Sequence, residues 1–314
     1  MIDENAQPLA HVVRGGLVES VHLGHLVALD ATGAEVLRRG DPGVTFYPRS
    51  SVKPVQAIAM LRAGLDLDGE LLALAASSNS GEPAHVEAAR EILAKAGLTE
   101  ADLQNTPVLP INADASFAWR AAGNGPSSLT QDCSGKHAAM LTTCVVNGWD
   151  LRTYRDPAHP LQQAIRATIA EFTGDGDPAH VTVDGCGAPL FSCTVGGLAR
   201  AFSRIATGAP GTPEHRVATA MRNHPWFVGG TGRRATRFME TVPGLIAKDG
   251  ADGVLAAALP DGAALAVKIL DGSGRSHRAV VAGALAALGV TGLDEIGHVD
   301  VLGHGEPVGA IVAV

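Results

Sequence analysis

Residues 20–39 begin with the aliphatic segment SVHLGHLVAL, continue through the turn-like segment DATG at 30–33, and end with AEVLRR. Two runs rich in valine and leucine on either side of an Asp- and Gly-containing turn predict two antiparallel strands. The other end of the chain has a related pattern. Residues 264–270 (ALAVKIL) resemble a strand, 271–274 (DGSG) a turn, 278–288 a helix and 308–314 a last short strand. Both ends of the chain therefore supply strands.

The chain between these ends has mostly helical patterns, at residues 51–63, 83–96, 135–147, 161–173 and 213–222. Strands and helices do not alternate, so a doubly wound parallel sheet is not expected. We expect an α+β fold in which a predominantly antiparallel sheet, built from both chain termini, is flanked by helices and has a helical block inserted. Because no linker or internal repeat interrupts the pattern, residues 1–314 are predicted to form a single domain.

Composition narrows the class of protein. The 314 residues carry 24 basic and 32 acidic side chains, a net charge of −8, and only 4% are aromatic. These values argue against nucleic acid or an anionic membrane as the main partner. Residues 279–290 are the longest apolar stretch and are too short to span a membrane. The N-terminus lacks the features of a secretory signal, and four cysteines do not make a disulfide framework. We expect a cytoplasmic enzyme.

The first candidate site is the segment RSSVKPVQ at 49–56. Ser50 and Lys53 are three residues apart at the start of a predicted helix, which places a hydroxyl and an amine on one face. A lysine with a lowered pKa can take the proton of such a serine and make it a nucleophile. The alternative is a serine that caps the helix and a lysine that faces solvent. Ser51 is a neighbouring hydroxyl without this spacing.

Two further polar features have both structural and catalytic interpretations. The segment SSNSGEP at 77–83 precedes a predicted helix, so its serines either cap that helix or supply a second hydroxyl as a proton shuttle. Lys268 lies in the strand predicted at 264–270. On a central strand a lysine is costly unless it is paired or functional, whereas on an edge strand it protects against edge-to-edge pairing.

Two cysteine-containing segments, DCSGKH at 132–137 and DGCGAP at 184–189, form another candidate site. Two thiolates with a nearby nitrogen donor could hold zinc, although the spacing is not that of a typical zinc site. The alternatives are buried structural cysteines, a disulfide, or a nucleophilic cysteine paired with His137. Cys144 and Cys193 lie in apolar surroundings and are expected in the core.

Five segments occur in one order that resembles the L-asparaginase II family, the rhizobial-type or class 3 asparaginases, on a scaffold like that of serine β-lactamases, penicillin-binding proteins and glutaminases. They are RSSVKPVQ at 49–56, SSNSGEP at 77–83, CSGKHA at 133–138, DGCGAP at 184–189 and VKILDG at 267–272. The resemblance covers most of the chain. It implies hydrolysis of the side-chain amide of L-asparagine to L-aspartate and ammonia through an acyl-enzyme, and a homodimer.

The resemblance also assigns residues. It makes Ser50 the nucleophile with Lys53 as partner, and Ser78 a second serine coupled to Lys268, with Ser80 as a rival to Ser78. A single zinc ion would be held by Cys133, Lys136 and Cys186, and the substrate would be bound by Arg49, Ser80, His137 and Asp184. Arg49 and Asp184 are candidates for the charges that recognise the carboxylate and ammonium groups of asparagine.

Two positions depart from the family pattern. Ala235, in the segment GTGRRAT at 230–236, stands where the family has Asp or Cys, and Asp132 stands where Asn is expected. These departures keep a non-catalytic zinc- or amino-acid-binding protein as one alternative. The other is a glutaminase or a β-lactam-processing enzyme on the same scaffold. Comparison of asparagine, glutamine and a β-lactam as substrates separates them.

Overall fold

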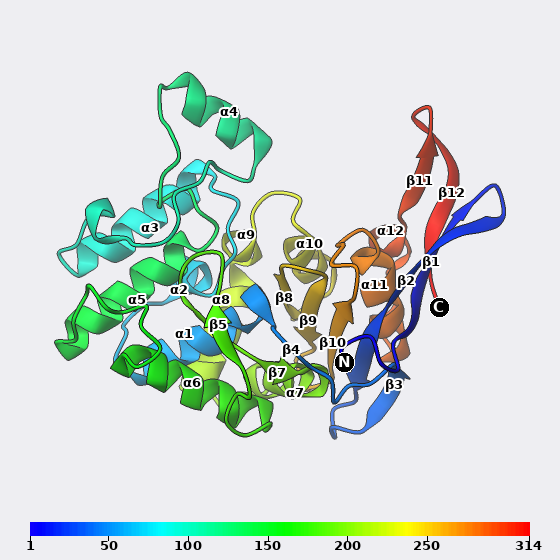
Figure 1. Ribbon diagram of the computed structural model, residues 1–314, viewed down its shortest axis with the longest axis horizontal. Coiled ribbons are helices and arrows are strands. Elements are labelled where there is room, and N and C mark those ends of the chain that lie inside the picture. The colour runs from blue at the N-terminus through cyan, green and yellow to red at the C-terminus, as the bar shows by residue number, and fades with distance from the viewer.

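A computed structural model describes residues 1–314 and shows one large antiparallel sheet beside a block of helices (Figure 1). The strands of the main sheet are β1 (Gln7–Arg14), β2 (Leu17–Leu29), β3 (Glu35–Arg39), β8 (Ile246–Gly250), β9 (Val254–Ala258), β10 (Ala264–Ile269), β11 (Asp300–Gly303) and β12 (Glu306–Ala313). Four shorter strands pair in two ribbons, β4 (Thr45–Phe46) with β7 (Cys193–Thr194), and β5 (Val181–Val183) with β6 (Pro189–Phe191).

The helices cluster in the middle of the chain. They are the 3₁₀ helices η1 (Arg49–Val52) and η2 (Glu100–Asp102), and the α-helices α1 (Lys53–Arg62), α2 (Gly69–Ala75), α3 (Pro83–Lys95), α4 (Ala113–Ala121), α5 (Ser134–Asn147), α6 (Pro160–Thr173), α7 (Val195–Ala206), α8 (Pro213–Asn223), α9 (Pro225–Val228), α10 (Arg234–Thr241), α11 (His277–Ala287) and α12 (Asp294–Gly297). None of them is long and apolar enough to cross a membrane.

The sheet joins the two ends of the chain, as predicted. Its strand order is β11-β12-β1-β2-β10-β9-β8, with β3 also paired to β2, and all neighbours are antiparallel. The predicted turn at 30–33 is present, since the Asp30 carboxylate accepts hydrogen bonds from the backbone N–H groups of Thr32 and Ala34. The prediction of an α+β fold with a sheet built from both termini is therefore confirmed.

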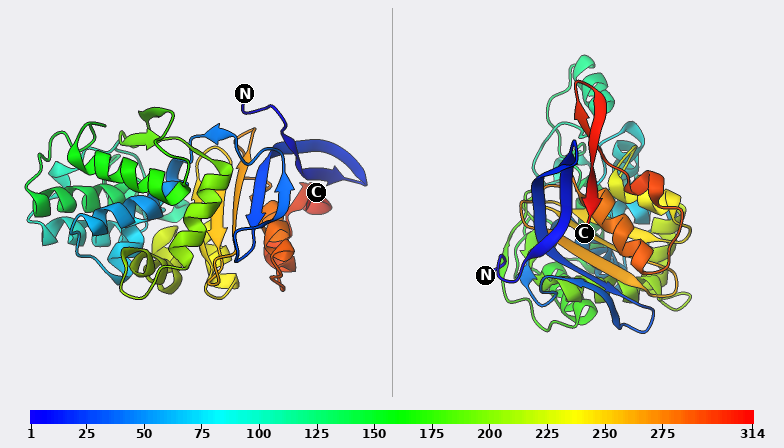
Figure 2. Two further views of the ribbon diagram at one scale, coloured as in Figure 1. Left: turned by 90° about the horizontal axis from the view of Figure 1, so that it is seen from below. Right: turned by 90° about the vertical axis from the view of Figure 1, so that its right-hand side faces the viewer.

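Helices cover both faces of the sheet. α7 packs on β9 and β10 from the side of the helical block, and α11 packs on the opposite face near β12 (Figure 2). The apolar core is a cluster of 80 buried residues to which both the sheet and the helical block contribute. The five predicted central helices correspond to η1 with α1, and to α3, α5, α6 and α8.

Some elements were not predicted, and α7 is the most central of them. Its first turn contains Gly196 and Gly197, which favour a loop when judged by local propensity. The Thr194 side chain nevertheless accepts a hydrogen bond from the Gly197 N–H and caps the helix. Tertiary burial of the apolar face then outweighs the weak propensity, because Leu198 and Phe202 are fully buried.

The edge strand β8 positions the site. It pairs only with β9 and packs against η1 at the boundary between the sheet and the helices. The approach is close at Gly250, where a Cβ atom would lie 2.6 Å from the Pro48 carbonyl oxygen and 3.2 Å from the Ser51 nitrogen. Only glycine fits this contact without a shift of the backbone.

Candidate active site

Ser50 lies in η1, immediately before α1 begins at Lys53. Its neighbour Arg49 has a φ of +52°, in the left-handed region that non-glycine residues rarely adopt. Such a conformation costs free energy and is maintained only where the surrounding structure holds it, often at functional sites. The Ser51 hydroxyl donates to the Pro48 carbonyl at 2.6 Å and is buried. Ser51 thus stabilises the turn, and Ser50 remains the half-buried hydroxyl of this segment.

Lys53 connects the first two serine motifs. Its side chain is 1% exposed, and Nζ donates a hydrogen bond to the Ser78 hydroxyl at 3.0 Å. Nζ also lies 3.5 Å from the Asp132 backbone carbonyl and 3.9 Å from the Asp132 carboxylate. The alternative of a solvent-facing lysine is therefore wrong. The departure at Asp132 places a negative charge beside Lys53.

The serines of the second motif do not cap the following helix. The N-cap of α3 is Glu82, and no side chain caps it. The Ser78 N–H donates to the Val228 carbonyl at 3.0 Å, which holds this loop against the end of α9. The Ser80 hydroxyl donates to the Glu82 carboxylate at 2.6 Å. Of the two candidate serines, Ser78 is the one in contact with a lysine.

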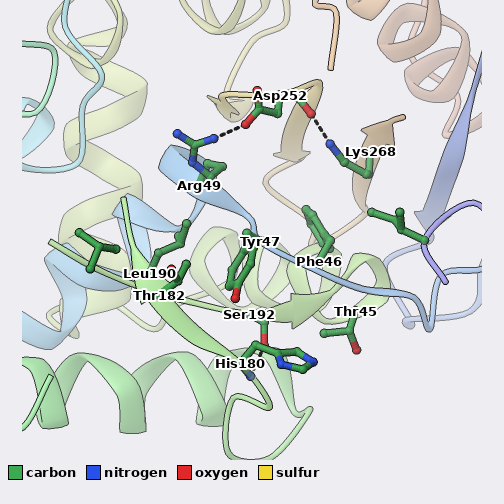
Figure 3. Close-up of a pocket in the computed structure, with 12 residues that line it drawn as sticks. Thr45, Phe46, Tyr47, Arg49, His180, Thr182, Leu190, Ser192, Asp252 and Lys268 are labelled. Carbon is green, nitrogen blue, oxygen red and sulfur yellow. Dashed lines mark hydrogen bonds and ion pairs between the residues drawn. The ribbon is translucent and has the colours of Figure 1, made fainter. Parts of the chain in front are cut away.

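Ser78 and Lys268, predicted to be coupled, have other hydrogen-bond partners in the structure. Lys268 lies in β10, a central strand between β2 and β9, and its Nζ donates to the backbone carbonyl of Asp252. Burial lowers the pKa of Lys268, opposed by the nearby Asp252 carboxylate. Lys268, Asp252 and Arg49 line a cleft of about 490 Å³ whose floor includes Phe46 (Figure 3). Lys268 thus belongs to this cleft, while Ser78 is bound by Lys53.

Arg49 is held by two carboxylates. Its Nε donates to Asp184 at 2.8 Å, and its Nη1 donates to Asp252 in the turn between β8 and β9. Asp252 also has a left-handed backbone, with φ +56°. The ion pair therefore fixes two strained residues to each other, one beside Ser50 and one beside the edge strand.

Lys248 is a candidate residue that the sequence interpretation missed. It is fully buried in β8, and because side chains alternate along a strand, it lies on the same face as Gly250, which contacts η1. Its Nζ donates to the Asp249 backbone carbonyl at 2.7 Å and to the Asp249 carboxylate at 3.0 Å. Burial lowers the pKa of Lys248 to about 8, opposed by Asp249 and assisted by the charge of nearby Lys53. The sequence could have indicated Lys248 in the same way as Lys268, because Lys248 also lies within an apolar segment, LIAKDG at 245–250.

Asp249 is a carboxylate shared by several cations. Besides Lys248, Arg233 Nη2 lies 3.4 Å and Arg234 Nη2 3.8 Å from its Oδ2. Burial opposes ionisation, but Lys248 and the two arginines hold the pKa of Asp249 well below its usual range. The departure at Ala235 lies next to this group, and that side chain is buried in the apolar core.

The three predicted zinc ligands lie close to one another. Lys136 Nζ is 3.2 Å from Cys186 Sγ, and Cys133 packs on Cys186, with all three residues buried. Hydrogen bonding from the Cys133 thiol and the charge of Lys136 hold the pKa of Cys186 well below its usual value, despite burial. Cys133 and Cys186 are free, so the disulfide alternative is wrong. The predicted burial of Cys144 and Cys193 is confirmed.

In this arrangement Lys136 and Cys186 form an ion pair. Burial opposes the charge on Lys136, but the neighbouring Cys186 and Cys133 raise the pKa of its amine well above the usual value. A thiolate, a second thiol and an ammonium therefore lie together, and no group of three His, Cys, Asp or Glu side chains has metal-binding geometry. His137 is fully buried behind them, with its Nδ1 2.7 Å from the Tyr154 hydroxyl and its Nε2 without a partner. Burial lowers the pKa of His137 to about 4, so the ring is neutral at physiological pH.

Comparison with known families identifies the family of the chain. The L-asparaginase II family model matches residues 10–313. The chain belongs to the L-asparaginase II family. Membership of this family indicates an amidohydrolase with a small-molecule substrate. No curated protein matches the sequence at a significant level.

Several solved structures align with this member of the family at low similarity. A β-lactamase from Mycobacterium bovis is 12% identical, with a TM-score of 0.46 over 80% of this chain and 88% of that chain. EstCE1, a hydrolase with promiscuous acyltransferase activity, is 12% identical, with a TM-score of 0.44 over 84% and 93% of the two chains. Mglu is 19% identical, with a TM-score of 0.36 over 84% and 66%.

Proposed function

We propose that this protein is an L-asparaginase, which hydrolyses the side-chain amide of L-asparagine to L-aspartate and ammonia through an acyl-enzyme on Ser50. The observation that carries the proposal is the buried 3.0 Å hydrogen bond from Lys53 to Ser78. This bond joins Lys53 to the second serine motif, and Ser50 lies three residues before Lys53, next to the left-handed residue Arg49. Membership of the L-asparaginase II family supports the same chemistry.

The proposed reaction has two stages, formation of an acyl-enzyme and its hydrolysis. The Ser50 hydroxyl attacks the amide carbon while the amine of Lys53 takes its proton. Ser78, hydrogen-bonded to Lys53, passes that proton to the nitrogen of the leaving group, and ammonia departs as the carbon–nitrogen bond breaks. Water then attacks the ester carbon, releases aspartate and returns the proton to Ser50.

Backbone and lysine groups around Ser50 support these steps. The backbone N–H of Ser50 is a candidate donor for the oxyanion, and loss of one such donor typically costs about 2.7–4 kcal/mol of barrier. Lys248, with a pKa of about 8, is the buried amine that readily exchanges a proton near neutral pH. We assign to Lys248 the supporting role that the sequence interpretation gave to Lys268.

The zinc site is part of the proposal. Cys133, Cys186 and Lys136 would hold the ion, and Lys136, whose pKa is raised by Cys186 and Cys133, would have to release its proton when the metal binds. Bound zinc would supply a fixed positive charge beside the substrate. Arg49 and Asp184 then line the site, and His137 supports it from behind through Tyr154. The homodimer and the cytoplasmic location stay predictions.

The test is ammonia release from L-asparagine and L-glutamine by the wild-type protein, by Ser50→Ala and by Ser51→Ala. Ser51→Ala is the matched control, because the Ser51 hydroxyl donates a hydrogen bond to the Pro48 carbonyl and has no role in the proposed reaction. We expect release from asparagine, loss of turnover in Ser50→Ala with an unchanged melting temperature, and retained turnover in Ser51→Ala. Turnover by Ser50→Ala at the wild-type rate would reject Ser50 as nucleophile. Release from glutamine alone would establish a glutaminase instead.

A further inference from the structure

The buried carboxylate of Asp249 is surrounded by an excess of positive charge. Lys248, Arg233 and Arg234 all have nitrogens within 3.8 Å of it, so three cationic side chains share one anion. The Nε atoms of Arg233 and Arg234 are buried and have no hydrogen-bond partner. Buried donors without partners are costly, and buried positive charge is stabilised by a further anion.

This cationic cluster, made of Lys248, Arg233 and Arg234, adjoins the second serine motif on one side and β8 on the other. The loop before Arg233 packs on the second serine motif, because Val228 accepts the Ser78 N–H bond at 3.0 Å and a side chain at Gly230 would overlap the Ser80 hydroxyl. On the other side, β8 continues from the cluster into the close contact with η1. Arg233 therefore lies between the two walls that adjoin Ser50. Its side chain is 27% exposed and is accessible to a ligand.

The cleft at Arg49 is different, because its charges are balanced. Arg49 is bound by the carboxylates of Asp184 and Asp252, and Lys268 lies in the same cleft, so two cations match two anions. A guanidinium with both carboxylates in place has little capacity left for a third. Arg233 and Arg234, which share Asp249 with Lys248, are therefore better placed than Arg49 to bind a further anion.

We propose that Arg233, supported by Arg234, binds the α-carboxylate of the substrate. The inference rests on the proposed function, because it concerns the same substrate at the same site. A guanidinium presents paired N–H donors that match a carboxylate, and the hydrogen bonds formed are stronger for being charged on both sides. The substrate class is therefore free α-amino acids, and a blocked α-carboxylate should be disfavoured.

The test compares L-asparagine with L-aspartic acid diamide, in which the α-carboxylate is a neutral amide. Binding is measured by calorimetry in the Ser50→Ala background, so that turnover does not interfere. In the Ser50→Ala protein, asparagine should bind about 10- to 100-fold more tightly than the diamide, the range expected for a hydrogen bond between charged groups. Adding Arg233→Gln should remove most of that difference by weakening asparagine and leaving the diamide nearly unchanged. Arg233→Lys should restore part of it.

Arg237→Gln is the matched control, since Arg237 lies in α10, which begins directly after Arg233, and makes no ion pair with Asp249. It should keep the full preference. Equal weakening of both ligands by Arg233→Gln, or a preference that survives it, would overturn the inference. If Arg233→Gln does not fold, as judged by its melting curve, Arg233→Lys carries the comparison, and an unchanged preference there overturns the inference. Absence of ammonia release by the wild-type protein would overturn the proposed function separately, because the binding comparison does not depend on turnover.

Discussion

Replacing Gly250 by alanine would push the edge strand β8 away from the 3₁₀ helix that carries Ser50. The added Cβ would lie 2.6 Å from the Pro48 carbonyl oxygen, whereas ordinary contacts begin at 3.4 Å, so the two backbones must separate by roughly 0.8 Å. A misplacement of about 1 Å can cost about 10²-fold in rate. We therefore expect kcat to fall by about 10- to 100-fold, and overpacking to lower the free energy of unfolding by about 1–3 kcal/mol.

The assay combines steady-state ammonia release from asparagine with denaturant unfolding. Gly125→Ala is the matched control, because a Cβ at this position meets no atom within 4 Å and the backbone φ is not positive. That variant should change stability by less than about 0.5 kcal/mol and leave kcat unaltered. Wild-type kcat in Gly250→Ala, with stability also unchanged, would show that the contact between β8 and η1 does not set the position of Ser50.

Three other measurements test separate parts of the site. Ser78→Ala should lower kcat by about 10²- to 10⁴-fold, the range expected when a group that transfers a proton is lost. Ser80→Ala should lower kcat much less, and the reverse order would make Ser80 the proton relay. The ammonium of Lys248 loses its proton as the pH rises through its pKa of about 8, so kcat/KM should increase with a midpoint near pH 8, and Lys248→Met should remove this limb. An identical pH profile in that variant would exclude Lys248. Cys186→Ser should lose zinc, measured by elemental analysis, whereas Cys144→Ser in the core should retain it; equal metal content in both would place zinc elsewhere.

Local patterns were sufficient for strands β2, β3, β10 and β12 at the two ends of the chain, whereas β1 and β11 were not predicted. The turn at Asp30 and the strands on either side of it are determined by residues that are neighbours in sequence, and the structure has them as predicted. The helix that begins near Ser50 was likewise visible from local spacing. Strands β8 and β9 were missed, because short alanine-rich runs such as Leu255–Ala258 have little β propensity and form strands only when paired.

The choice between two lysines shows what local patterns lack. Lys268 and Lys248 both interrupt apolar segments, and nothing within those segments distinguishes them. Their difference arises from strand order, since β10 is central and β8 is the edge that contacts η1. The left-handed backbone of Arg49 has the same origin, because its partner Asp252 is 203 residues away. Long-range pairing, which a single sequence does not display, decides both.

The position of β2 has a consequence for synthesis of the protein. Leu29, made early, pairs with Ala264, and β1 pairs with β12 at the very end of the chain. One edge of β2 therefore stays unpaired on the ribosome until most of the polypeptide has emerged. Strand β8, which packs against the helix of Ser50, is also synthesised late. Nascent and prematurely terminated chains would expose a long apolar strand edge that favours aggregation, and hydrolase activity would first appear with the nearly complete chain. Enzymatic activity therefore requires that the C-terminal strands have been synthesised and have paired with the N-terminal ones.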